Sequence, residues 1–163
     1  MSKSPPPFSV AAPFSVTPPF SVTIEVRDAC LCMHVQRAAR ALARRYDATL
    51  RPAGITGGQF SILMALNRPE PPLLGAVAAL LAMDRTTLTA NLKPLRHRGL
   101  VDIVADAQDR RGRRLILTAA GGAALARALP AWRRAQRVLS HEIGKARLDG
   151  FLATLRLLAG DGA

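Results

Sequence analysis

The chain has 163 residues, of which 49% are hydrophobic and 4% aromatic, so aliphatic side chains must fill the core of about one domain. Lysine and arginine number 23 against 11 acidic residues, which gives a formal net charge of +12. This excess predicts a polyanionic partner, either nucleic acid or an acidic membrane surface. The sequence contains no apolar run long enough to cross a bilayer and no secretory signal pattern, so we expect a cytoplasmic protein.

Residues 1–26 carry a short proline-rich repeat. Pro-Phe-Ser-Val recurs from Pro7, Pro13 and Pro19. So much proline opposes a helix, and the repeat is too short to bury a face of its own. We therefore expect a disordered leader over 1–26. The alternative is a strand-like arm on a partner subunit, because Phe and Val favour extended backbone.

From Asp28, the expected cap, the pattern becomes helical and is predicted to end at Pro52 and Gly54. Its apolar residues recur every three or four positions: Leu31, Val35, Ala38 or Ala39, Leu42, Tyr46 and Leu50. Thr56 and Gln59 then have the spacing of a capping box, which predicts a second helix. Further helices are predicted over 74–81 and from Thr118 to about Leu158, with a break at Gly144. The total is about six helices.

Residues 84–118 predict a helix, a strand, a basic turn and a second strand. Asp84 can cap a helix that reaches Arg98, and Gly99 follows it. The strands are expected over 100–104 and 115–117, joined by a basic loop. The segment 84–114 holds eight basic and four acidic residues. A helix of this kind can enter a DNA major groove while a basic hairpin beside it reaches phosphates or the minor groove.

The helix after Asp84 offers one apolar face and one polar face. Leucines at 88, 92 and 95 share a stripe that must face the core. The candidate DNA-binding residues project elsewhere and carry hydroxyl or basic groups: Arg85, Thr86, Thr87, Thr89 and Lys93. Pro94 lies in mid-helix, where we expect a bend or compensation from the packed leucines.

These motifs resemble the MarR family of bacterial transcription regulators over roughly residues 28–158. The resemblance is strongest in Asp84-Arg85-Thr86-Thr87-Leu88-Thr89, Gly99-Leu100-Val101, Asp109-Arg110-Arg111, and Leu117-Thr118 with Gly121. It implies a mainly α winged helix-turn-helix with a small β-hairpin wing, in a single structural domain. The DNA-binding lobe would span 55–118. The helices of 27–54 and 119–160 would intertwine with those of a second subunit in an obligate homodimer.

The resemblance also implies roles for individual residues. The protein would bind a pseudo-palindromic double-stranded DNA operator, usually as a repressor. Arg110, Arg111 and Arg113 would be the wing arginines that reach the minor groove, and Asp109 would orient an arginine. The chain departs from the family at Ala82, where a turn glycine is common. Gly75 is a second irregularity, because glycine costs up to about 1 kcal/mol inside a helix.

Cys30 and Cys32 are redox candidates. Some members of the family sense peroxides through a cysteine near the start of the first helix. A thiol in that position can have a lowered pKa, and His34 lies one turn further on. A packing role is the competing interpretation, because no distant cysteine exists to resolve a sulfenic acid.

The sequence favours a non-enzymatic, sequence-specific DNA-binding regulator, with a small aromatic or oxidant effector that shifts it away from DNA. The alternatives are a cysteine-based peroxide-sensing repressor of the same family and an effector-free architectural nucleic-acid-binding protein. We find no phosphate loop, metal motif or nucleophile elbow, so we expect no catalytic site, metal or cofactor.

Overall fold

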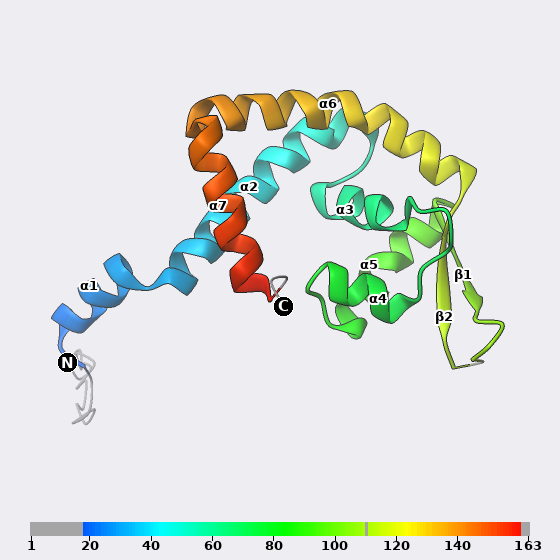
Figure 1. Ribbon diagram of the computed structural model, residues 1–163, viewed down its shortest axis with the longest axis horizontal. Coiled ribbons are helices and arrows are strands. Elements are labelled where there is room, and N and C mark those ends of the chain that lie inside the picture. The colour runs from blue at the N-terminus through cyan, green and yellow to red at the C-terminus, as the bar shows by residue number, and fades with distance from the viewer. Residues whose placement is uncertain (1–17, 110, 161–163) are drawn as a thin grey trace, which may run out of the picture. The chain divides into compact units, whose positions relative to one another are not determined.

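The computed structural model describes residues 18–109 and 111–160, which belong to two compact units, residues 1–40 and 41–163 (Figure 1). The helices are α1 (Phe20–Ala29), α2 (Leu31–Leu50), the 3₁₀ turn η1 (Arg51–Ala53), α3 (Gly57–Leu66), α4 (Leu74–Leu80), α5 (Arg85–His97), α6 (Ala119–Ile143) and α7 (Lys145–Ala159). The strands β1 (Val101–Ala105) and β2 (Arg113–Leu117) form one antiparallel hairpin. The mainly α fold with a hairpin agrees with the sequence prediction.

The end of the leader expected over 1–26 is helical rather than disordered, because α1 begins at Phe20. Pro19 is the N-cap of α1, where its missing N–H costs nothing. No proline or glycine follows until after Ala29, so the third repeat can propagate as a helix. Asp28 lies near the end of α1 and pairs with Arg27, so the prediction that it begins the next helix was wrong. Residues 1–17 of the repeat lie outside the described residues.

Within the larger unit, glycine and threonine signals place the helix ends where the sequence predicted them. Gly54 follows η1 with a φ of 73°, a backbone conformation that glycine adopts without strain. The Thr56 hydroxyl accepts from Gln59 N, and the Gln59 side chain accepts from Thr56 N, completing the capping box. Gly144 separates α6 from α7 with a φ of 84°.

The turn between α4 and α5 contains a strained residue at the position where the family commonly has a glycine. Ala82 has a φ of 49° and is the one non-glycine residue with positive φ in the described part of the chain. A Cβ makes this conformation unfavourable. Asp84 then caps α5, with its carboxylate accepting from Thr87 N at 2.7 Å.

The hairpin is longer than predicted at its outer end. Val101 pairs with Leu117 and Ala105 with Arg113, so β1 reaches Ala105 and β2 begins at the basic residue Arg113. Arg113 and Arg114, which are not apolar and were expected in the loop, belong to β2. Backbone pairing, rather than hydrophobicity, determines where these strands end.

The core joins α3–α6 and the base of the hairpin. Its most deeply buried large side chains are Leu50, Ile62, Leu63, Val77, Leu88, Leu92, Leu95, Val101 and Leu115. Gly121, in the first turn of α6, permits close packing, because a Cβ there would lie 2.2 Å from Leu100 O. In the described residues no helix has the length and hydropathy to cross a membrane.

Candidate nucleic-acid interface

The exposed face of α5 carries all five residues that the sequence selected. Leu88, Leu92 and Leu95 are each 0% exposed and hold the opposite face of the helix against the core. The five selected residues are all exposed: Arg85, Thr86, Thr87, Thr89 and Lys93. The leucine stripe therefore fixes which face of α5 a ligand can reach.

The three threonines differ in what their hydroxyls can offer. Thr87 Oγ1 donates to Asp84 Oδ2 at 2.6 Å, and Thr89 Oγ1 donates to Arg85 O at 2.7 Å. Their protons are engaged inside the helix, so only their lone pairs remain for a ligand. Thr86 makes no side-chain hydrogen bond within the described residues. The hydrogen bonds from Thr87 also hold the pKa of Asp84 below its ordinary value, which keeps the cap ionised.

Gly75 has a packing role that the sequence did not reveal. A Cβ at this position would lie 3.1 Å from Arg85 Nη2, so the Arg85 guanidinium rests against the backbone of α4. This contact connects the first residue of α5 to the preceding helix. The apparent helix-breaking glycine thus provides room for a candidate DNA-binding side chain.

The tip of the hairpin is built by two aspartates. Asp106 Oδ1 accepts from the backbone N of Gln108 at 2.7 Å and of Asp109 at 3.0 Å. Asp109 Oδ1 accepts from Arg111 N at 2.9 Å. Asp109 therefore shapes the backbone that presents Arg111, whereas its expected role of orienting an arginine side chain stays a prediction.

Arg114 lies inward, away from the other arginines of the hairpin. Its Nε donates to Asp106 Oδ2, and its Nη1 donates to Pro71 O at 2.8 Å. Asp106 is 5% exposed and is the one buried charged residue in the described part of the chain. Both residues belong to the charged segment 84–114, but their pairing was not expected from the sequence. Asp106 and Arg114 flank the hairpin turn in the sequence, and opposite charges at those positions could have indicated an ion pair.

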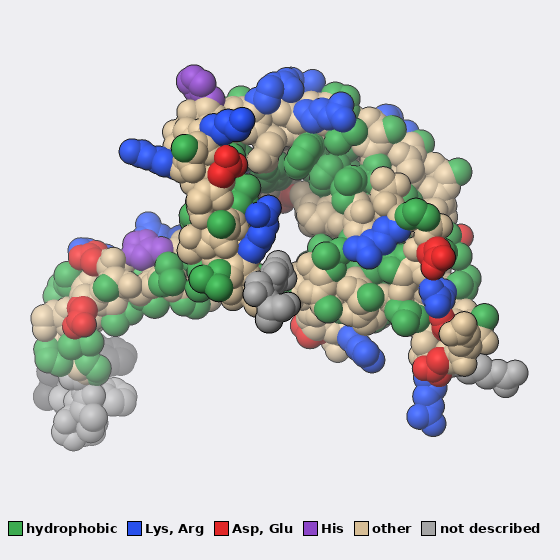
Figure 2. Space-filling view, in the orientation of Figure 1, with side chains coloured by type: hydrophobic (Ala, Val, Ile, Leu, Met, Phe, Trp, Pro, Cys, Tyr) green, Lys and Arg blue, Asp and Glu red, His purple; other side chains and the backbone are tan. Residues whose placement is uncertain are grey.

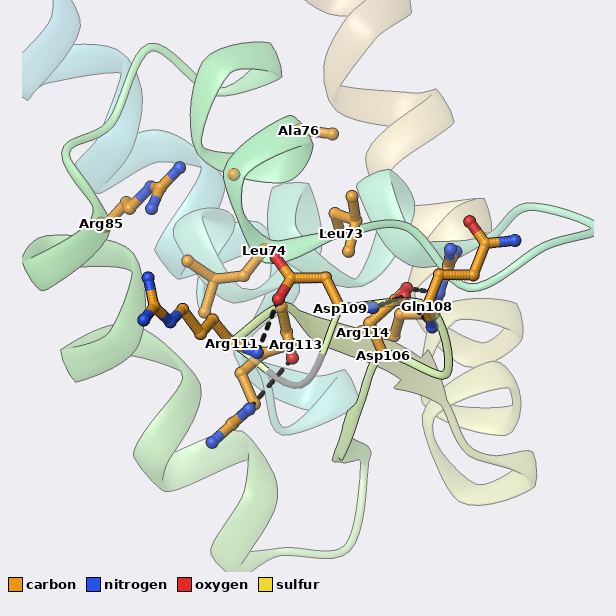
Figure 3. A pocket seen from close by; sticks show the side chains of 12 residues that line it. Leu73, Leu74, Ala76, Arg85, Asp106, Gln108, Asp109, Arg111, Arg113 and Arg114 are labelled. Atoms are coloured by element: carbon orange, nitrogen blue, oxygen red, sulfur yellow. Dashed lines mark hydrogen bonds and ion pairs between the residues drawn. The ribbon is translucent and has the colours of Figure 1, made fainter.

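Arg85, Arg111 and Arg113 line one cavity of about 590 Å³ between the hairpin and α4. Arg85 and Arg111 lie on the same side of it, whereas Arg114 lies at the other end beside Asp106 and Gln108 (Figure 3). Arg111 and Arg113 are exposed, and basic side chains project at the far end of the hairpin (Figure 2). Arg110 lies outside the described residues.

The backbone holds the base of the hairpin against α5 and the segment before α4. β1 follows α5 through Gly99, and these two elements pack directly against each other. Leu115 N donates to Pro72 O at 3.0 Å, which attaches β2 to the segment before α4. Because Arg85 at the start of α5 lines the same cavity as Arg111 and Arg113, a duplex that met this end of α5 would also meet cations from the hairpin.

The cysteines lie far along the chain from this interface, and both are free thiols. Cys30 is half-buried between α1 and α2, and its carbonyl accepts from His34 N at 3.1 Å. Cys32 is exposed, and its Sγ accepts from Gln36 Nε2 at 3.3 Å. Among the described residues no group of three or more His, Cys, Asp or Glu side chains could hold a metal ion.

A second hollow lies on the lobe, between α3, α4 and α6, with a volume of about 480 Å³. Phe60 and Trp132 stack at its wall with ring centroids 6.0 Å apart. Met64 and Leu80 add apolar surface that is 42% and 54% exposed. Arg68 is the one cation in its lining.

Comparisons with known proteins agree on the kind of protein that this chain is similar to. The sequence model of the MarR family matches residues 53–112. The transcriptional regulator MosR of M. tuberculosis, solved in complex with DNA, is 40% identical with a TM-score of 0.72, over 81% of this chain and 97% of MosR. No curated protein sequence matches.

Two further solved structures are more distant in sequence. The transcriptional repressor CouR, bound to a 23-mer DNA duplex, is 29% identical with a TM-score of 0.71, over 79% of this chain and 92% of CouR. The regulator PcaV of Streptomyces coelicolor, in complex with its natural ligand, is 25% identical with a TM-score of 0.67, over 82% of this chain and 96% of PcaV.

Proposed function

Because this chain belongs to the MarR family of DNA-binding transcription regulators, we propose that it represses transcription by binding a pseudo-palindromic operator as a homodimer. The observation that carries the proposal is the exposed polar face of α5 beside a hairpin with exposed arginines. Two such surfaces related by a two-fold axis would contact half-sites about one helical turn apart.

In this proposal α5 enters the major groove. Thr86 can donate and accept at base edges, whereas Thr87 and Thr89 accept only. Arg85 and Lys93 contact phosphates beside the groove. Arg110, Arg111 and Arg113 form the wing, of which Arg111 and Arg113 are exposed in the described residues.

The dimer would be formed by the terminal helices. Neither α1 nor α7 buries a residue in the described chain. They expose large apolar side chains that a second copy can cover: Phe20, Val22, Val26, Phe151, Leu157 and Leu158. Covering such surfaces is the usual source of dimer stability.

The effector that fits the hollow between α3, α4 and α6 is a small aromatic carboxylate. Phe60 and Trp132 offer a stacking surface, and Arg68 offers a cation for the carboxylate. The solved complex of PcaV with its natural ligand supports a ligand-responsive mechanism. Binding would favour a spacing of the two α5 helices that does not match the operator.

A cysteine-based response to oxidants is the second candidate. It is favoured by two free thiols, Cys30 and Cys32, that lie where α1 ends and α2 begins. Titrating the protein–operator complex with peroxide and, separately, with small aromatic carboxylates distinguishes the two effectors. Release by peroxide that is abolished in Cys30→Ser supports the thiol, whereas peroxide release that persists in this variant removes it.

The function is tested by selecting duplexes from a random-sequence library with the purified protein. We expect a pseudo-palindromic consensus, and a binding constant that falls with salt. Arg111→Ala should reduce the slope of that salt dependence by about 0.9 for each phosphate that the side chain no longer neutralises. Arg127→Gln, on the exposed surface of α6, is the matched control for the removal of one charge. No consensus, or a wild-type slope in Arg111→Ala, contradicts the proposal.

A further inference from the structure

The tip of the wing is assembled on a single carboxylate. Asp106 N donates to Gly112 O at 3.1 Å, while Asp106 Oδ1 receives the backbone N–H groups of Gln108 and Asp109. Gly112 N in turn donates to Asp109 O at 2.8 Å. The backbone that presents the tip arginines therefore depends on where the Asp106 carboxylate is held.

The second carboxylate oxygen is held by Arg114. The Asp106 side chain is only 4% exposed, and a buried carboxylate is unfavourable unless its oxygens are paired. Arg114 Nε satisfies Oδ2, and the side chain of Arg114 is itself 34% exposed. The guanidinium thus has its polar edge turned into the protein rather than toward a ligand.

The same guanidinium reaches a segment outside the wing. Arg114 Nη1 donates to Pro71 O at 2.8 Å, beside the main-chain hydrogen bond from Leu115 N to Pro72 O at 3.0 Å. A bridge also pairs Leu73 with Arg114. Arg114 is therefore the side chain that connects the tip carboxylate to the segment leading into α4.

We propose that Arg114 is a positioning residue for DNA binding: by joining Asp106 to Pro71 O, it fixes the wing tip relative to α4, and so to α5 that follows it, without contacting DNA itself. This inference rests on the proposed function. Lysine cannot replace it, because one ammonium on a flexible stem cannot present a rigid fork to two acceptors. The other arginines of the hairpin would contact DNA, and Arg114 would decide where they stand.

The test is a double-mutant cycle with Arg111→Ala and Arg114→Gln, measured on the duplex that wild-type protein selects from a random-sequence library. We expect Arg114→Gln to lower the salt slope by at least as much as Arg111→Ala does, which is about 2 for the two subunits of a dimer. The double variant should then lose less binding free energy than the sum of the two single losses, because part of what Arg114→Gln removes is the contact of Arg111 itself. Arg127→Gln should keep the wild-type slope.

Amide hydrogen exchange supplies the second readout. Arg114→Gln should accelerate exchange at the Gln108 and Asp109 amides, which donate to Asp106, while the amides within α5 stay protected. If Arg114→Gln folds poorly, Arg114→Lys replaces it in the test, because lysine keeps the positive charge. It should accelerate exchange at the same two amides.

Three results would overturn the inference. Additive losses in the cycle would mean that Arg114 contacts DNA directly. Wild-type affinity in Arg114→Gln would mean that the main-chain hydrogen bonds suffice, and unchanged exchange at the tip amides would mean that Asp106 keeps its place alone. If the wild-type protein selects no duplex at all, it is the proposed function that fails, since the exchange experiment needs no DNA.

Discussion

The DNA-binding lobe buries its apolar residues within the chain, whereas the terminal helices leave theirs exposed. In the lobe, three leucines of α5 are each 0% exposed and the core is complete within the chain. In α7, Leu157 is 72% exposed and no residue is buried, and in α1 Phe20 is 75% exposed. Surface apolar residues are common singly, but these recur along whole helices.

This difference indicates where the fold depends on a second molecule. A segment that buries its own apolar face is stable by itself, whereas an amphipathic helix without a partner gains little from hydrophobic burial. The lobe should therefore keep its structure in a single chain. The terminal helices should acquire much of their stability on dimerisation, and in doing so place two α5 helices on one duplex.

The largest effect should come from a charge on the exposed face of α7. Leu157→Glu would place a carboxylate where the partner subunit is expected to cover Leu157. Sedimentation should show a monomer, and operator affinity should fall about 10²–10⁴-fold, because two half-sites are no longer held together.

The matched control on the same helix is Arg156→Gln, which changes an exposed side chain that is already polar. It should remain dimeric and bind the operator nearly as the wild type does. A dimeric Leu157→Glu protein with intact operator affinity would show that the exposed apolar surface of α7 has another purpose.

Truncating one leucine in the lobe and one in α7 tests whether each region is packed within its own chain. Leu92→Ala should lower the free energy of unfolding by about 2–5 kcal/mol, because it leaves a cavity in a packed core. Leu157→Ala should change it by less than about 0.5 kcal/mol in dilute, dissociated protein. At high protein concentration the second effect should grow, since dimerisation and folding are then linked.

Denaturant unfolding at two protein concentrations measures both effects. If Leu157→Ala were as costly as Leu92→Ala in dilute protein, α7 would be packed within its own chain. A decrease in stability that did not depend on concentration would lead to the same conclusion.

Local signals in the sequence were sufficient for most of the lobe. Thr56 with Gln59, Asp84 and Thr118 each predicted a helix start through side-chain capping, and each cap is present. The start of α1 could not be found in this way. It depends on the absence of proline after Pro19, whereas the repeat as a whole indicated the opposite.

The candidate site also combines features that a single element determines with contacts that only the fold creates. The leucine periodicity of α5 correctly predicted which of its side chains are exposed, because a single helix determines its own faces. The contacts of Arg85 with Gly75 and of Arg114 with Asp106 and Pro71 join residues from different elements. Charge counting placed all these arginines in one basic cluster, and only the fold separates an inward guanidinium from the outward ones.

Ala82→Gly should stabilise the lobe by about 1 kcal/mol. Its φ of 49° is unfavourable for a residue with a Cβ and natural for glycine. The same substitution at exposed Ala79, inside α4, should destabilise by about 1 kcal/mol, because glycine weakens a helix interior. Thermal unfolding of the two variants measures the contrast, and a destabilised Ala82→Gly would mean that the turn is relaxed with alanine.

The smallest expected effect is on the pKa values of two carboxylates, Asp106 in the lobe and Asp28 in α1. The pKa of Asp106 lies below its ordinary value mainly because the backbone N–H groups of Asp109 and Gln108 bind its ionised form. The pKa of Asp28 is also lowered, but chiefly by the exposed Arg27 side chain. Each carboxylate contributes stability above its unfolded pKa, and that contribution disappears as the pH falls through the lowered folded value.

High salt should affect the pKa values of Asp28 and Asp106 differently. In about 1 M salt the Debye length falls to roughly 3 Å, so the pKa of Asp28 should return toward its ordinary value. The pKa of Asp106 should stay low, because directed hydrogen bonds in a nearly buried site are screened far less. Titration of the carboxyl carbons by NMR at low and high salt measures both values. An Asp106 pKa that rose with salt as much as that of Asp28 would place the wing carboxylate among the exposed, weakly held charges of the terminal helices.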